Sequence, residues 1–136
     1  MATQIKIKNL PEGYQSIITN GKHTIIGDEP VNSKGTDLGL SPSELVLSGL
    51  ALCKVATVRY IARQKGWEIG EVKAELDQEV ERYPSSLKTN IGVKISIEGN
   101  LNNEQRDELL KQADRCYIHR QFFGEWNIEN AEILKS

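Results

Sequence analysis

Two cysteines, Cys53 and Cys116, carry the most specific chemistry in this chain of 136 residues. A thiolate is a nucleophile and a redox centre, and a second thiol within reach converts its oxidation into a reversible disulfide. Cys53 lies in the most apolar stretch of the chain, which by itself favours an inert core thiol. A helical turn after Cys116 would bring His119 beside the second thiol. The residues leave two interpretations open, a pair of core thiols and a redox pair.

Other chemistries have weaker support. A structural zinc site needs four ligands at close spacings, and the chain has two Cys and two His. A Cys–His pair for hydrolysis has no third residue to orient it, and no glycine pattern resembles a phosphate-binding loop. We therefore expect no metal and no cofactor. Glu44 follows Ser41 by three residues, which favours helix capping and leaves a pocket carboxylate as the alternative.

Composition predicts one globular domain over residues 1–136, with 38% hydrophobic and 26% charged residues. The formal net charge is -2 and no basic block occurs, so neither nucleic acid nor an anionic membrane is an expected partner. The longest apolar run, residues 45–53, is too short to span a membrane. The first four residues do not resemble a signal peptide, so we expect a cytoplasmic location.

The first third of the chain predicts short strands. Apolar stretches separated by turn residues predict strands over 4–8, 14–19 and 22–27, and Asn20–Gly21 is typical of a two-residue hairpin turn. Residues 28–40 are rich in Gly, Pro, Asn, Ser and Asp and predict a loop. Its length suggests a role in function or in packing against a partner.

A long helix is predicted from Ser41 to about Lys65, ending at Gly66. Its first half is apolar nearly all the way round, which predicts a buried helix. Such a rod is about 36 Å long at 1.5 Å per residue, whereas a compact chain of this size has a radius of gyration of about 14 Å. The rest of the chain cannot easily cover it, so we expect a homodimer in which this helix packs against its symmetry mate.

After the helix the apolar pattern changes to a period of two. Alternation over 72–80 and 91–97 predicts a long antiparallel pair with one solvated face. A second helix begins at Asn102, with Gln105 placed for a capping box, and a last strand runs from about 126 to 134. The apolar stripe of this second helix comprises Leu109, Leu110, Ala113, Cys116 and Tyr117. The order βββ-α-ββ-α-β predicts an α+β fold with an antiparallel or mixed sheet on one side of the helices.

Three stretches together resemble the OsmC/Ohr superfamily. They are residues 35–45 (GTDLGLSPSEL), 51–53 (ALC) and 109–120 (LLKQADRCYIHR), and the resemblance extends over about residues 27–133. It implies the OsmC-like fold, an intertwined homodimer in which two sheets wrap two long helices.

The resemblance also implies thiol chemistry. The residue matching Cys53 attacks an organic hydroperoxide and becomes a sulfenic acid. The residue matching Cys116 resolves it as a disulfide, which a dithiol reductant then reduces. A sulfenic acid is reversible when a second thiol waits nearby.

The chain departs from the family's pattern at the start of the long helix. Peroxidase members carry Glu directly after the proline, where this chain has Ser43, with Glu44 one place later. The family's thiolate-stabilising Arg comes from the N-terminal strands, whereas the first arginine here is Arg59. The candidate activating cations are Lys22, Arg59, His119 and Arg120. These departures favour an alternative function, a non-enzymatic dimer with unreactive core cysteines that binds a small apolar ligand or serves as a structural module.

Overall fold

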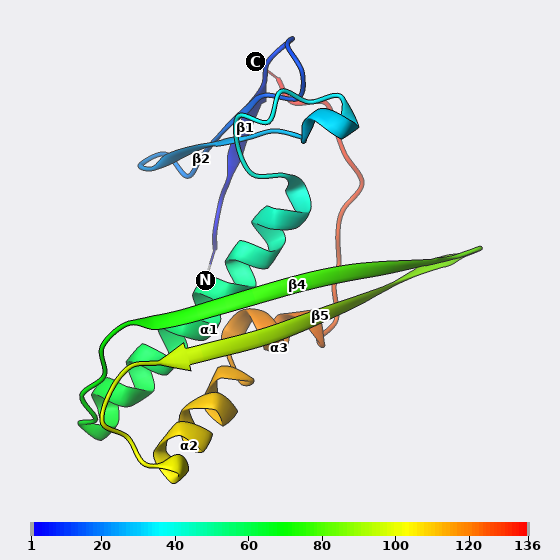
Figure 1. The fold of residues 1–136 in the computed structure, drawn as a ribbon. Helices are drawn as coiled ribbons and strands as arrows, with labels where there is room; N and C mark the ends of the chain where they lie inside the picture. The colour runs from blue at the N-terminus through cyan, green and yellow to red at the C-terminus, as the bar shows by residue number, and fades with distance from the viewer. Residues whose placement is uncertain (1, 136) are drawn as a thin grey trace. The chain divides into compact units, whose positions relative to one another are not determined.

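The computed structural model describes residues 2–135 and divides the chain into two compact units, Met1–Gly49 and Leu50–Ser136. The element order is three short strands, a 3-10 turn, a long helix, two long strands and two further helices (Figure 1). This order confirms the expected α+β class.

The first unit contains a three-stranded antiparallel sheet with β1 (Lys6–Asn9), β2 (Ser16–Thr19) and β3 (Thr24–Gly27) in sequence order. All three lie within about two residues of the predicted strands. Between β2 and β3, the Asn20 side chain accepts hydrogen bonds from the Lys22 and His23 amides. Gly21 has a φ of 96°. The hairpin turn predicted there is confirmed.

The loop over 28–40 is organised around one buried carboxylate, that of Asp28. Its oxygens accept hydrogen bonds from the Thr36 hydroxyl at 2.6 Å, the Glu29 amide at 2.7 Å and the Leu38 amide at 3.2 Å. These bonds, that of the Thr36 hydroxyl foremost, lower the Asp28 pKa to about 2 against the opposing effect of burial. The loop also contains a short 3-10 turn, η1 (Val31–Ser33).

Helix α1 (Pro42–Lys65) begins and ends where the sequence predicts. At its start, the Glu44 carboxylate accepts from the Ser41 amide at 2.9 Å, and the Glu44 amide donates to the Ser41 hydroxyl at 3.3 Å. Gly66, with a φ of 69°, terminates the helix in a backbone conformation that glycine tolerates.

The single chain buries only one line of α1 and leaves much of the rest of the helix uncovered, in agreement with the expectation that one chain cannot easily cover it. The buried residues are Leu50, Lys54, Val58 and Ala62, spaced by four. Leu52, by contrast, is 68% exposed. By length and hydropathy α1 is apolar enough to cross a membrane, a test that core helices of soluble proteins also pass.

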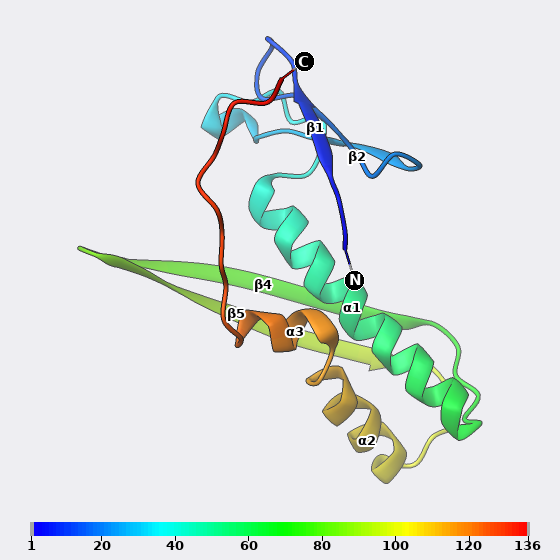
Figure 2. The ribbon, with the colours of Figure 1, turned by 180° about the vertical axis from the view of Figure 1, so that it is seen from behind.

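Strands β4 (Val72–Tyr83) and β5 (Ser86–Ile97) form the predicted antiparallel pair, with Val72 opposite Ile97 and Tyr83 opposite Ser86. Side chains of β4 alternate between half-buried and exposed over its first eight residues. Toward the turn both faces are exposed, and this end of the hairpin extends beyond the helices in both views (Figures 1 and 2).

The core of the second unit joins α1, β5 and α2 (Asn103–Ala113). Its buried residues are Val58, Ala62, Ile97, Leu109 and Ala113. The Asn102 side chain accepts from the Gln105 amide and the Gln105 side chain accepts from the Asn102 amide, so the predicted capping box is confirmed.

Two predicted elements at the C-terminal end are wrong. Helix α2 ends at Ala113, and Cys116 lies beyond it as the residue that precedes a short helix, α3 (Tyr117–Phe122). The predicted strand over 126–134 does not form, because residues 125–135 pair with no strand in the described part of the chain and expose their apolar side chains. The observed order is therefore βββ-α-ββ-α-α, with two separate antiparallel sheets.

Candidate functional site

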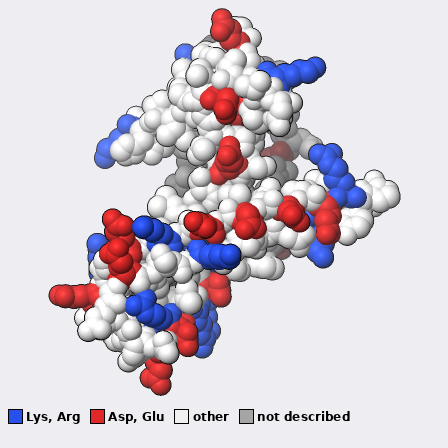
Figure 3. All heavy atoms as spheres, viewed as in Figure 1, with Lys and Arg blue, Asp and Glu red and all other residues white. Residues whose placement is uncertain are grey.

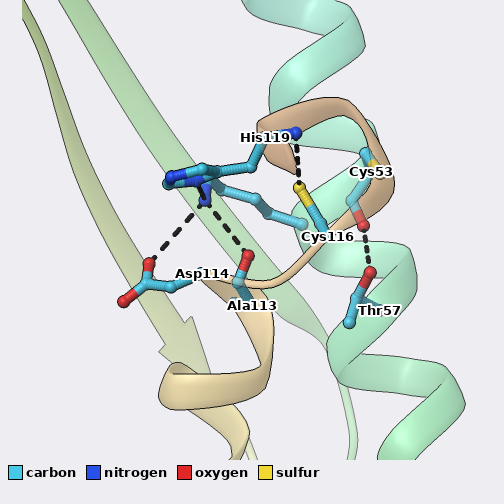
Figure 4. Close-up of polar contacts among 7 residues, drawn as sticks. Cys53, Thr57, Ala113, Asp114, Cys116 and His119 are labelled. Atoms are coloured by element: carbon cyan, nitrogen blue, oxygen red, sulfur yellow. Dashed lines mark hydrogen bonds and ion pairs between the residues drawn. The ribbon is translucent and has the colours of Figure 1, made fainter. Parts of the chain in front are cut away.

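The two cysteines meet within the second unit, although 63 positions separate them in sequence. Cys53 lies on α1, and Cys116 lies on the segment between α2 and α3 (Figure 4). Two consecutive amides donate hydrogen bonds to the two sulfur atoms. Ile118 N donates to Cys53 Sγ and His119 N donates to Cys116 Sγ, each at 3.4 Å. Both cysteines are free thiols. This arrangement brings two thiols from distant parts of the chain into one site.

The two thiols differ in their surroundings. Cys53 is half-buried, whereas Cys116 is 1% exposed. Burial raises the pKa of the Cys116 thiol, and the hydrogen bond from the His119 amide and the charge of Lys54 oppose that rise. A hydrogen bond with the Cys53 side chain raises the Cys116 pKa further. Cys53 is thus the thiol more open to a reactant, and Cys116 is the more protected of the two.

A buried lysine lies directly beside the cysteines. Lys54 is 1% exposed, and its Nζ donates to the Ala113 carbonyl at 3.1 Å and contacts His119 Nδ1 at 2.8 Å. The Asp114 carboxylate lies 3.7 Å from Nζ (Figure 4). The Asp114 side chain is itself mostly exposed. Because the Ala113 carbonyl bonds to Lys54, this tertiary contact satisfies a carbonyl at the end of α2.

The structure brings one of the candidate cations, His119, into the site, as the spacing from Cys116 suggests. His119 is half-buried, and its ring stacks on Phe123 with centroids 5.2 Å apart. Arg59 donates from Nη1 to the Ile69 carbonyl at 3.2 Å, and Arg120 lies over the Tyr117 ring. Both arginines therefore have partners other than a thiol.

The remaining candidates belong to the first unit. The Glu44 side chain caps α1, as the spacing from Ser41 predicts, and hydrogen bonds with Ser41 lower the Glu44 pKa. Ser43 is exposed in the first turn of α1. Lys22 is exposed in the turn between β2 and β3, where its amide donates to Asn20.

Sequence reasoning missed two residues, Asp28 and Lys54, which are the buried polar or charged residues of the described chain. A signal for Lys54 exists, because it follows Leu50 and precedes Val58 by four residues on the most apolar face of α1. A charge in such a line requires a partner from elsewhere in the fold. Asp28 begins a loop rich in backbone turns and has no comparable signal.

A cavity of about 300 Å³ opens in the first unit, between the sheet and the start of α1. Its lining is largely apolar and includes Ile7, Ile18, Leu40 and Leu45. The volume falls at the lower end of the range for small-molecule sites.

A profile of the OsmC-like protein family matches residues 35–129, which include both cysteines and most of the chain. The chain belongs to the OsmC-like protein family. The resemblance seen in the sequence is thereby confirmed. A search among curated proteins found no match for this OsmC-like protein.

Solved structures of the same fold are similar over nearly the whole chain. An OsmC-like protein from Mycoplasma pneumoniae is 20% identical with a TM-score of 0.77, covering 91% of this chain and 89% of that one. A putative osmotic stress induced and detoxification response protein from Psychrobacter arcticus is 19% identical with a TM-score of 0.75, covering 89% and 88%. An organic hydroperoxide resistance protein OsmC from Legionella pneumophila is 20% identical with a TM-score of 0.70, covering 91% and 90%. At these identities the likeness concerns the fold.

The surface of this OsmC-like protein carries charges of both signs. On the face shown in Figure 3, basic and acidic side chains lie close to one another, and neither sign forms a continuous block. This mixture agrees with the formal net charge of -2.

Proposed function

We propose that this OsmC-like protein reduces organic hydroperoxides, with Cys53 as the attacking thiol and Cys116 as the resolving thiol. The observation that carries the proposal is that two consecutive amides donate hydrogen bonds to the two cysteine sulfur atoms. Of the two cysteines, Cys53 is half-buried and Cys116 is buried.

The first step uses the more accessible thiol. The Cys53 thiolate attacks one oxygen of the hydroperoxide, an S–O bond forms and the O–O bond breaks. The alkoxide that leaves takes up a proton and becomes an alcohol, and Cys53 becomes a sulfenic acid. The sulfur is oxidised by two electrons and the peroxide is reduced by two.

The second step uses the protected thiol. Cys116 sulfur attacks Cys53 sulfur, an S–S bond forms, the S–O bond breaks, and the departing hydroxide and the thiol proton make one water. A dithiol reductant then reduces the disulfide by two thiol–disulfide exchanges. We place this cycle in the cytoplasm, where such reductants keep thiols reduced.

The test is treatment of the reduced protein with one equivalent of cumene hydroperoxide, followed by mass spectrometry. We expect an intramolecular Cys53–Cys116 disulfide, formed much faster than free cysteine is oxidised. Cys53→Ser should abolish peroxide consumption, whereas Cys116→Ser should still react and leave a sulfenic acid that dimedone traps. Oxidation of Cys53 no faster than that of free cysteine, by cumene or lipid hydroperoxide, would refute the proposal.

We further propose that the working unit is a homodimer in which α1 packs against its copy. Support comes from apolar side chains that the single chain leaves uncovered on this helix, with Val46 51%, Leu52 68% and Tyr60 59% exposed. Light scattering at micromolar concentration should give twice the chain mass. Leu52→Glu should weaken the dimer and Gln64→Glu, on the same helix, should not. A stable wild-type monomer would contradict this proposal.

A second candidate function rests on the apolar cavity of the first unit. In this alternative the protein binds a small apolar ligand and its cysteines are unreactive. Cys53→Ser protein would then still bind the dye 8-anilino-1-naphthalenesulfonate, and Leu45→Glu in the cavity wall would reduce that binding. Dye binding by a protein whose Cys53 does not react with hydroperoxide would favour this function over the first.

A further inference from the structure

The function proposed above assigns no role to Lys54, the one buried basic residue of the described chain. Burying an ammonium is costly unless its donors are satisfied. Here they are, because Nζ contacts the Ala113 carbonyl, His119 Nδ1 and, at a longer distance, the Asp114 carboxylate. An apolar residue in the line from Leu50 to Ala62 would avoid that cost. The lysine is therefore a feature to be explained.

The contact with Lys54 orients the His119 ring. An ammonium has donors only, so in this contact the ring nitrogen Nδ1 is the acceptor. The stack of the ring on Phe123 holds its plane. Lys54 thus anchors the ring in one orientation.

The partners of Lys54 flank the second thiol on both sides. Ala113 precedes Cys116 by three residues and His119 follows it by three, and each also bonds to Cys116: the Cys116 amide donates to the Ala113 carbonyl at 3.3 Å, and the His119 amide donates to Cys116 Sγ at 3.4 Å. Lys54 itself follows Cys53 in α1. One side chain therefore connects the helix of the first thiol to both ends of the segment that carries the second.

We propose that Lys54 is a positioning residue for the resolving thiol: it holds residues 113–119 against α1 and supports the negative charge that Cys116 carries when it attacks oxidised Cys53. This inference rests on the proposed two-thiol cycle and concerns its second step. Cys116 is buried, so its thiolate lacks the solvation that water would give it. The ammonium replaces part of that solvation. The titratable groups around the Lys54 ammonium are His119, Asp114 and Cys116.

The experiment isolates the second step by replacing the peroxide with diamide. Diamide adds to a first thiol, and the second thiol then attacks that sulfur, so that the S–S bond forms and the reduced hydrazine leaves. The rate of Cys53–Cys116 disulfide formation is measured by quenching and mass spectrometry between pH 6 and 9.5. We expect Lys54→Met to slow closure at neutral pH about tenfold or more and to raise the midpoint of the pH–rate profile by about one unit or more.

Two further variants separate an electrostatic role from a structural one. Lys54→Arg keeps the charge and should return the midpoint toward the wild-type value. Asp114→Asn, at a largely exposed side chain, should lower the midpoint, because it removes a negative charge near the ammonium. A uniform slowing of Lys54→Met at every pH, with no shift of the midpoint, would overturn the proposal, as would wild-type behaviour of that variant.

If Lys54→Met does not fold, two variants of the half-buried His119 provide the test. His119→Gln keeps an acceptor for Lys54 and should close the disulfide faster than His119→Leu, which removes the acceptor; equal rates would overturn the proposal. Diamide also separates the two proposals. Suppose that disulfide formation with diamide depends on Lys54 in a protein whose Cys53 does not react with hydroperoxides. That result would support this inference and refute the peroxidase function.

Discussion

Formation of the Cys53–Cys116 disulfide should stabilise the protein by an amount that the chain topology sets. The bond closes a loop of about 60 residues, and the loss of loop entropy in the unfolded chain corresponds to about 4 kcal/mol at 25 °C. The thiols already share one site, where consecutive amides hydrogen-bond to both sulfurs, so the folded state requires little rearrangement to form the bond. For a chain of this size the gain corresponds to a rise in Tm of roughly 10–15 °C.

The assay compares urea unfolding of diamide-oxidised protein with and without dithiothreitol, followed by circular dichroism. Protein concentration is held constant, because the stability of an oligomer depends on it. Cys116→Ser should show no difference between the two conditions. Oxidised protein that is no more stable than reduced protein, or a disulfide that joins two chains on a non-reducing gel, would refute the reasoning that the two thiols of one chain are poised to pair.

Three further predictions concern the fold that supports the site. Leu109→Ala, at a fully buried position, should lower the free energy of unfolding by about 2–5 kcal/mol, and Leu110→Ala, at a position 40% exposed, should cost clearly less in the same urea titration; equal costs would contradict the packing of α2 described above. Because the folded pKa of Asp28 is about 2, below its ordinary 3.8, the stabilisation it provides is present above pH 3.8 and is lost as the pH falls toward 2. Acid titration of Asp28→Asn should lack that component, and an unchanged profile would argue against it. Glu44→Gln should keep both the cap of α1 and the peroxidase rate, whereas Glu44→Ala should destabilise the fold; a loss of rate in Glu44→Gln with unchanged stability would instead indicate a pocket carboxylate.

Local patterns predicted the elements that depend on local physics. Hydrogen bonds between residues three apart form the cap of α1, from Ser41 to Glu44, and the capping box from Asn102 to Gln105. The end of α1 depends on the backbone conformation of one residue, Gly66. Period-two alternation likewise predicted the β4–β5 pair, because successive side chains of a strand point to opposite faces.

Features that depend on distant partners could not be predicted in this way. The apolar stripe of the second helix continues past Ala113, but the helix does not, and the Ala113 carbonyl accepts from the Cys116 amide and from the distant Lys54 ammonium. The strand predicted over 126–134 has suitable residue types and no strand to pair with among the described residues of one chain. A strand needs a neighbour, and composition does not supply one.

The sequence by itself determined the family, the α+β class and the identity of the two thiols, because motifs, periodicity and residue chemistry are local. Only the tertiary structure decided that Cys53 and Cys116 share a site, that one is half-buried and the other buried, and that Lys54 contacts the segment that carries Cys116. Thiol environment and ion pairing depend on distances in space, which packing of α1 against the segment over 113–119 creates. In the sequence, Lys54 interrupts the apolar pattern of a helix. In the folded chain, its side chain connects the helix that carries Cys53 to the segment that carries Cys116.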